Sequence, residues 1–165
     1  MEITMKTFAY VSLAIFTLGS VASAEELHER NISLATATEL AQKGVKACSS
    51  KGYNVSVAVV DRAGVLRSLM RADGAGPHTV GAAQAKAFTA ASGRALTSAM
   101  AKTVQENPGA AGLVDIPGYL VLAGGVPIKI GDETIGAIGI GGAPGGNLDE
   151  ECAQAAVEKI KDKLN

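Results

Sequence analysis

The chain is poor in aromatic and metal-binding side chains. Its 165 residues include three Tyr, three Phe and no Trp, two cysteines, and two histidines, His28 and His78. Two histidines and two cysteines give no ligand pair at the spacing typical of zinc sites. The scarcity of aromatic residues leaves a single subunit little apolar area for lining a pocket. We therefore expect no zinc site and no deep aromatic pocket built by one chain alone.

The chain also lacks an excess of charge of either sign. Fifteen Lys and Arg residues stand against sixteen Asp and Glu, and the formal net charge is −1. Nucleic-acid-binding surfaces are strongly basic, so we expect no nucleic-acid partner. A membrane-spanning helix needs about 20 consecutive apolar residues. No segment beyond the first 24 residues has that length, so we expect no stable membrane insertion.

The N-terminus is typical of an exported protein. A lysine precedes the apolar run at residues 8–18, which is too short to span a bilayer, and Ala-Ser-Ala at 22–24 fits a cleavage site. We predict a signal peptide over residues 1–24 and a periplasmic or secreted protein. A short buried N-terminal helix is the alternative. Residues 25–32 are predicted to be a flexible arm, and residues 33–165 are predicted to form one domain.

The two cysteines each fall on an apolar helical stripe. Apolar side chains recur at steps of three and four along the first predicted helix, at Leu34, Ala37, Ala41, Val45 and Cys48. The last helix carries a similar stripe, at Cys152, Ala156, Ile160 and Leu164. In an oxidising compartment an even pair of cysteines favours a disulfide, provided that the two helices pack side by side. Two buried thiols are the alternative.

The order of predicted elements indicates an antiparallel sheet. A helix that Ser33 caps and Gly52 ends precedes two strands, at 55–60 and 65–70, joined by a turn at 61–64. Two helices follow, at 79–92 and 97–105. Three strands come next, one at 119–122 and two in the segments around Gly131, Asp132 and Glu133. The last helix begins at Asn147, with Glu150 placed for a capping box. Strands grouped as hairpins favour an α+β domain over a doubly wound parallel fold.

The glycine-rich string at residues 139–146 precedes the last helix. A phosphate-binding loop would be followed by Gly-Lys-Ser/Thr, whereas three acidic residues open this helix. The string is therefore predicted to be a tight strand-to-helix connection. Its backbone N–H groups could still hold part of an anion or a carboxylate. The chain also lacks the G-x-S-x-G motif of serine hydrolases.

His78 follows a glycine-rich turn and Pro77, which places it in the first turn of an Ala-rich helix. The positive end of the helix dipole favours the neutral imidazole there. A plain surface histidine is the alternative. Lys86 lies two turns further along on about the same face, where it is either solvated or paired with a carboxylate. Phe88 is interpreted as a core residue.

Five segments in this order resemble the GlcG/HbpS-like family, which is also called the haem-degrading domain family and includes the C-terminal domain of PduO-type proteins. The segments are 57–64, 70–75, 85–90, 124–128 and 135–142, and the resemblance covers residues 33–164. It implies a profilin-like α/β/α layered domain around a five-stranded antiparallel sheet. It also implies homo-oligomers built from dimers, such as octamers. Several exported members of the family bind haem.

The resemblance implies a binding edge in the segment from Asp73 to Thr89. Within this edge we expect His78 to be the axial ligand of haem iron and Lys86 to pair with a haem propionate. The further candidates for cofactor binding are Arg71, Asp73, Gly74 and Phe88. Met70 and Tyr119 are alternative ligands, and His28 could coordinate iron if the N-terminal arm folded back. We assign no catalytic residue.

Three functions remain open from the sequence. The first is an exported haem-binding protein that stores, senses or scavenges haem, with a sensor or haem-transport partner and a weak capacity for haem degradation. The alternative is a small-carboxylate-binding accessory protein or enzyme of the GlcG type, with Asp61 or Asp73 as acid or base and Arg71 as a carboxylate clamp. The third is a structural oligomer or signalling adaptor.

Overall fold

A computed structural model describes residues 26–164, so the predicted signal peptide lies outside the described residues. No helix within this range is long and apolar enough to cross a membrane. The elements in chain order are α1 (Leu34–Ser49), β1 (Ser56–Asp61), β2 (Leu66–Arg71), α2 (His78–Gly93), α3 (Thr97–Glu106), the 3-10 segment η1 (Pro108–Asp115), β3 (Gly125–Ile130), β4 (Glu133–Gly141), α4 (Gly146–Glu158) and the short 3-10 segment η2 (Lys161–Lys163).

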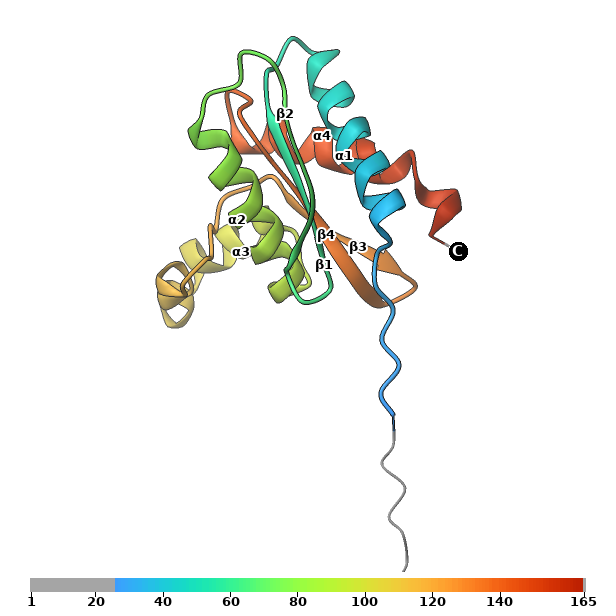
Figure 1. Ribbon diagram of the computed structural model, residues 1–165. Coiled ribbons are helices and arrows are strands. Elements are labelled where there is room, and N and C mark those ends of the chain that lie inside the picture. The colour runs from blue at the N-terminus through green and yellow to red at the C-terminus, as the bar shows by residue number, and fades with distance from the viewer. Residues whose placement is uncertain (1–25, 165) are drawn as a thin grey trace, which may run out of the picture.

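The described strands form one antiparallel sheet between two helical layers. The strand order is β2-β1-β4-β3, and every neighbouring pair is antiparallel. Helices α1 and α4 cover one face and α2 covers the other (Figure 1). The α/β/α layers and the antiparallel sheet predicted from the sequence are confirmed. Pro127 lies in β3, an edge strand, where its missing N–H costs little.

The sheet has four strands rather than the five expected, because residues 119–122 do not form a strand. The backbone N–H of Leu120 donates to the Thr89 hydroxyl on α2 at 2.8 Å, and Leu122 N donates to Leu120 O in a tight turn. This segment therefore runs beside α2, and its backbone groups find partners there rather than on a neighbouring strand.

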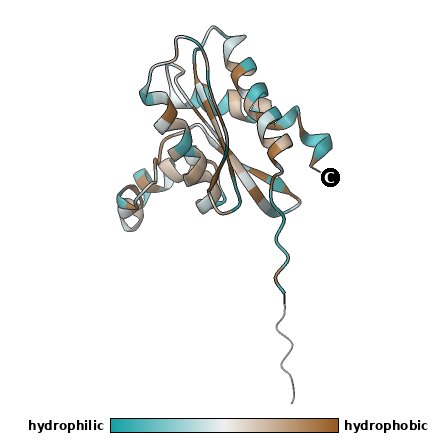
Figure 2. Ribbon diagram, viewed as in Figure 1, coloured by the Kyte–Doolittle hydropathy of each residue, from teal (hydrophilic) through white to brown (hydrophobic). Residues whose placement is uncertain are grey.

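The two faces of the sheet have different cores. The face toward α1 and α4 buries larger aliphatic side chains such as Val57, Ile138 and Ile140. The face toward α2 is mostly alanine, with Ala58, Val60, Ala83, Ala87, Ala90, Ala91 and Ala137. A Cβ on Gly139 of β4 would collide with the backbone of α2 at Ala83 and Ala87. Small residues therefore let α2 lie unusually close to the sheet. In Figure 2, apolar residues gather on the central strands, while hydrophilic ones mark the outer turns.

The start of α1 follows the sequence prediction closely. The Ser33 hydroxyl accepts the N–H of Thr36 at 3.1 Å, as an N-cap does. Most of the predicted stripe is buried, but Leu34, the first residue of α1, is 57% exposed. Packing begins one residue before the cap: Ile32 is buried, and its N–H donates to Ile135 O.

The predicted capping box at the start of α4 is wrong. The N-cap is Gly145, and Asn147 lies inside the helix without capping it. Glu150 does not turn back to the helix start, because its carboxylate accepts hydrogen bonds from Ser98 and from Gly124 N. A tertiary contact has replaced the local one.

A disulfide joins Cys48 at the end of α1 to Cys152 in α4, with the two Cα atoms 5.4 Å apart. Both cysteines are fully buried, as their positions on the two apolar stripes predict. The bond spans 104 residues of the chain. A cross-link over so long a loop removes much conformational entropy from the unfolded state.

We expect the double substitution Cys48→Ala/Cys152→Ala to lower the free energy of unfolding by about 2–5 kcal/mol in urea titrations. Wild-type protein under reducing conditions should show a similar loss, and the double variant should not respond to reductant. Equal stability of the oxidised wild type and the double variant would contradict a stabilising disulfide.

Candidate functional site

A cleft of about 540 Å³ opens at one end of the sheet. Its walls are residues 52–54, which follow α1, residues 74–79 at the start of α2, and the glycine-rich string 141–146 between β4 and α4. We call it the glycine cleft. Its volume lies within the range of about 300–1,000 Å³ typical of ligand sites. Because glycines occur in all three walls, a ligand can approach the backbone closely there.

His78 lies at the rim of the glycine cleft. It is the first residue of α2 and follows Pro77, as predicted. Its side chain is exposed, and it makes no hydrogen bond to any residue in the described part of the chain. The imidazole lies against Gly76, where an added Cβ would come within 2.7 Å of the ring. Because no residue in the described part of the chain forms a hydrogen bond with the imidazole, its ring nitrogens can bind a ligand.

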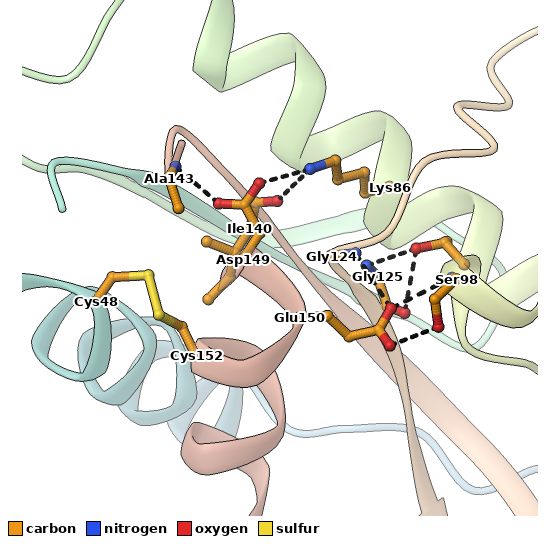
Figure 3. A network of polar contacts seen from close by, with 11 residues as sticks. Cys48, Lys86, Ser98, Gly124, Gly125, Ile140, Ala143, Asp149, Glu150 and Cys152 are labelled. Atoms are coloured by element: carbon orange, nitrogen blue, oxygen red, sulfur yellow. Dashed lines mark hydrogen bonds and ion pairs between the residues drawn. A yellow bond between two sulfur atoms is a disulfide. The ribbon is translucent and has the colours of Figure 1, made fainter. Parts of the chain in front are cut away.

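The floor of the cleft is a buried ion pair between α2 and α4. Lys86 is 2% exposed, and its Nζ donates to Asp149 Oδ2 at 2.8 Å and to Ile140 O at 3.0 Å (Figure 3). The other carboxylate oxygen of Asp149 accepts the N–H of Ala143 at 3.0 Å. This cluster joins α2, the end of β4 and the start of α4. The cleft therefore has a fixed floor in which the lysine charge is already neutralised.

Gly124 makes room for this pair. Its φ is 125°, a conformation that favours glycine, and a Cβ there would crowd Lys86 Nζ and Ile140 O. The N–H of Gly124 donates to Glu150 Oε2 at 3.2 Å, and the Ser98 hydroxyl donates to Glu150 Oε1 at 2.6 Å. Consecutive acidic residues of α4 therefore bind different parts of the fold, Asp149 to α2 and Glu150 to α3 and to the residue before β3 (Figure 3).

The structure brings together three of the predicted site residues, since His78, Lys86 and Gly74 all line the glycine cleft. Asp73 lies on the exposed turn beside it. Arg71 also lies beside the cleft, and its guanidinium donates to Ala75 O at 3.0 Å.

Phe88 lies outside the cleft. It is partly buried and lines a separate hollow together with Gly64 and Gly118. Its ring meets that of Tyr119 edge to face, with centroids 6.0 Å apart. Met70 packs against the core beneath α1. Neither alternative iron ligand, Met70 or Tyr119, lines the glycine cleft, and His28 is exposed near Glu26.

The sequence analysis missed Asp149, Tyr53, Asn54 and Leu122, which also line the cleft. One signal could have found Asp149. A lysine within an Ala-rich helix that packs on a sheet requires a buried counter-charge, and acidic residues clustered at the start of α4. Tyr53 and Asn54 gave no such signal, because their position depends on how α1 meets α4.

The acid–base role considered for Asp61 in a small-carboxylate enzyme finds little support in its position. Asp61 Oδ1 accepts the N–H groups of Ala63 and Val65, each at 3.0 Å, which stabilises the turn between β1 and β2. This turn lies at the opposite end of β1 from residues 52–54, so Asp61 is remote from the cleft. Within residues 26–164, no group of three or more His, Cys, Asp or Glu side chains is placed to hold a metal ion.

Comparisons with known proteins agree on one family. Residues 32–158 match the family described as haem degrading protein HbpS-like. Protein GlcG of Escherichia coli K12 is 34% identical over 109 residues, which is 66% of this chain and 80% of that protein. A crystal structure of a double mutant of Streptomyces reticuli HbpS is 39% identical with a TM-score of 0.79, covering 92% of this chain and 98% of that one. The crystal structure of a PduOC–haem complex is 25% identical with a TM-score of 0.72, covering 79% and 95%.

We expect Lys86→Met to lower the free energy of unfolding by about 3–5 kcal/mol, because it leaves the Asp149 carboxylate buried without a partner. Adding Asp149→Leu should recover much of that loss. The matched control is Lys51→Met. Lys51 pairs with Glu151 at the same 2.8 Å, but the two side chains are 42% and 54% exposed, so the cost should be at most about 1 kcal/mol. Equal losses for the two lysine variants in urea titrations would contradict a structural role for the buried pair.

Proposed function

The chain belongs to the HbpS-like family, and on this premise we propose that it binds haem in the glycine cleft with His78 as axial ligand to the iron. The observation that carries the proposal is the free imidazole of His78 at the rim of the cleft. Neutral histidine is a common haem ligand. The relatives agree with this proposal, since one similar structure is a haem complex.

The residues of the cleft fit such a ligand. Haem iron needs only one or two ligands from the protein, so a single histidine is sufficient where no larger metal-binding cluster is present among residues 26–164. The glycine-rich walls at 74–76 and 141–146 would let a flat macrocycle approach the backbone. Bound haem would supply a redox-active iron. The role of the chain is to bind and orient it at an accessible rim, which suits storage, sensing or scavenging of haem.

We further propose that the protein is exported to the periplasm or the cell exterior. The signal-like N-terminus and the Cys48–Cys152 disulfide support this, because disulfides persist in oxidising compartments. A sensor or haem-transport protein as partner remains a prediction from the family resemblance.

The proposal includes assembly as a homo-oligomer. Edge strand β2 exposes Leu66 and Leu69, and η1 exposes Val114 and buries none of its residues. Large apolar side chains exposed to solvent favour association with another protein surface. Light scattering of residues 25–165 should give a mass of at least twice the monomer, and Leu69→Ser should reduce it. A monomeric mass at micromolar concentration would contradict the proposal.

Haemin titration of residues 25–165, followed by absorbance, should give a saturable Soret shift. His78→Ala should weaken binding by at least about tenfold, equivalent to 1.4 kcal/mol, and should change the spectrum, because the iron loses its protein ligand. The matched control is His28→Ala, which removes the other histidine, 85% exposed on the N-terminal segment, and should leave binding unchanged.

Two results would contradict this proposal in different ways. A Soret shift that survives in His78→Ala would exclude His78 as the ligand while leaving haem binding intact. A flat titration of the wild type would exclude haem and would favour a small carboxylate as the ligand of the cleft.

A further inference from the structure

The charges of the glycine cleft are unevenly placed. Lys86 and Asp149 are the two charged side chains that line it, and they neutralise each other at the floor. Both are almost fully buried, at 2% and 4% side-chain exposure. A second carboxylate brought to Lys86 would have to share one ammonium group with Asp149 in a low-dielectric site. Burial of a carboxylate without its own counter-charge is strongly unfavourable, so the floor selects against a charged ligand group.

A free cation lies at the rim instead. Arg71, the last residue of β2, is exposed and forms no ion pair with any residue between 26 and 164. Its guanidinium donates to Ala75 O at 3.0 Å. The residues on either side of Ala75, Gly74 and Gly76, both line the cleft. The hydrogen bond therefore holds the guanidinium beside the cleft opening, and the remaining N–H groups of the guanidinium can bind a carboxylate.

We propose that the ligand enters the glycine cleft with an uncharged edge toward the floor and with its carboxylates at the rim, where Arg71 binds one of them. This inference rests on the proposed function, in which the ligand is haem and the carboxylates are its propionates. It moves the propionate contact from Lys86, where the sequence analysis expected it, to Arg71. Lys86 then shapes the site without meeting the charge of the ligand.

The test compares haemin with its dimethyl ester, which lacks both propionate charges, in the same mild detergent. Wild-type protein should bind haemin about two- to fivefold more tightly than the ester, as expected for one solvent-exposed ion pair. Arg71→Gln should abolish that preference by weakening haemin binding alone. The matched control is Arg67→Gln on the same strand. Arg67 is also exposed, but it lies toward the other end of β2 and, within residues 26–164, makes no hydrogen bond to the turn beside the cleft as Arg71 does, so its variant should keep the preference.

The Lys86→Met/Asp149→Leu variant distinguishes a propionate contact with Arg71 from one with Lys86. It should keep the wild-type preference for haemin, because the floor does not contact the propionates. Loss of the preference in this variant, together with its retention in Arg71→Gln, would overturn the inference and assign the propionate to Lys86. Equal wild-type affinity for haemin and ester would exclude any carboxylate contact. Failure of both ligands to bind would instead defeat the proposed function itself.

Discussion

The buried pair between Lys86 and Asp149 is the interaction on which the arrangement of the site depends. It connects the helix on one face of the sheet to the start of α4 on the other, through the end of β4, with a 2.8 Å contact at 2% and 4% exposure. The close approach that permits it comes from small residues, because α2 packs on the sheet through alanines and Gly124 leaves space for the lysine. Each buried charge neutralises the other, so the floor of the cleft carries no net charge.

The disulfide holds the same region from the other side. Cys48 lies just before residues 52–54, and Cys152 lies nearly two turns into α4, after the glycine-rich string. Two walls of the glycine cleft are therefore tied together by a covalent bond, and the exposed Lys51–Glu151 pair lies beside it. Because the ends of these walls are fixed, the walls can contain glycine and still hold their shape. A ligand site requires such a rigid frame.

Local patterns in the sequence were sufficient for most elements but not for the contacts between them. The stripe ending at Cys48, the hairpin around Asp61 and the helix that begins at His78 follow from periodicity and turn chemistry, and all are found. The predicted cap at Asn147 and the strand at 119–122 failed because Glu150 and Leu120 bond to distant partners. The same limitation applies to the site, where His78 was identifiable as a helix-start residue but Asp149 depends on tertiary packing.

We propose the glycine cleft, and not another surface, as the place where haem binds. The most direct test is a crystal structure of the mature chain with haemin. We predict that the macrocycle lies between residues 52–54 and the glycine-rich string, with the iron bonded to an imidazole nitrogen of His78 and the propionates at the rim. Haem lying elsewhere, for example in the hollow beside Phe88, or iron bonded to another residue, would contradict it.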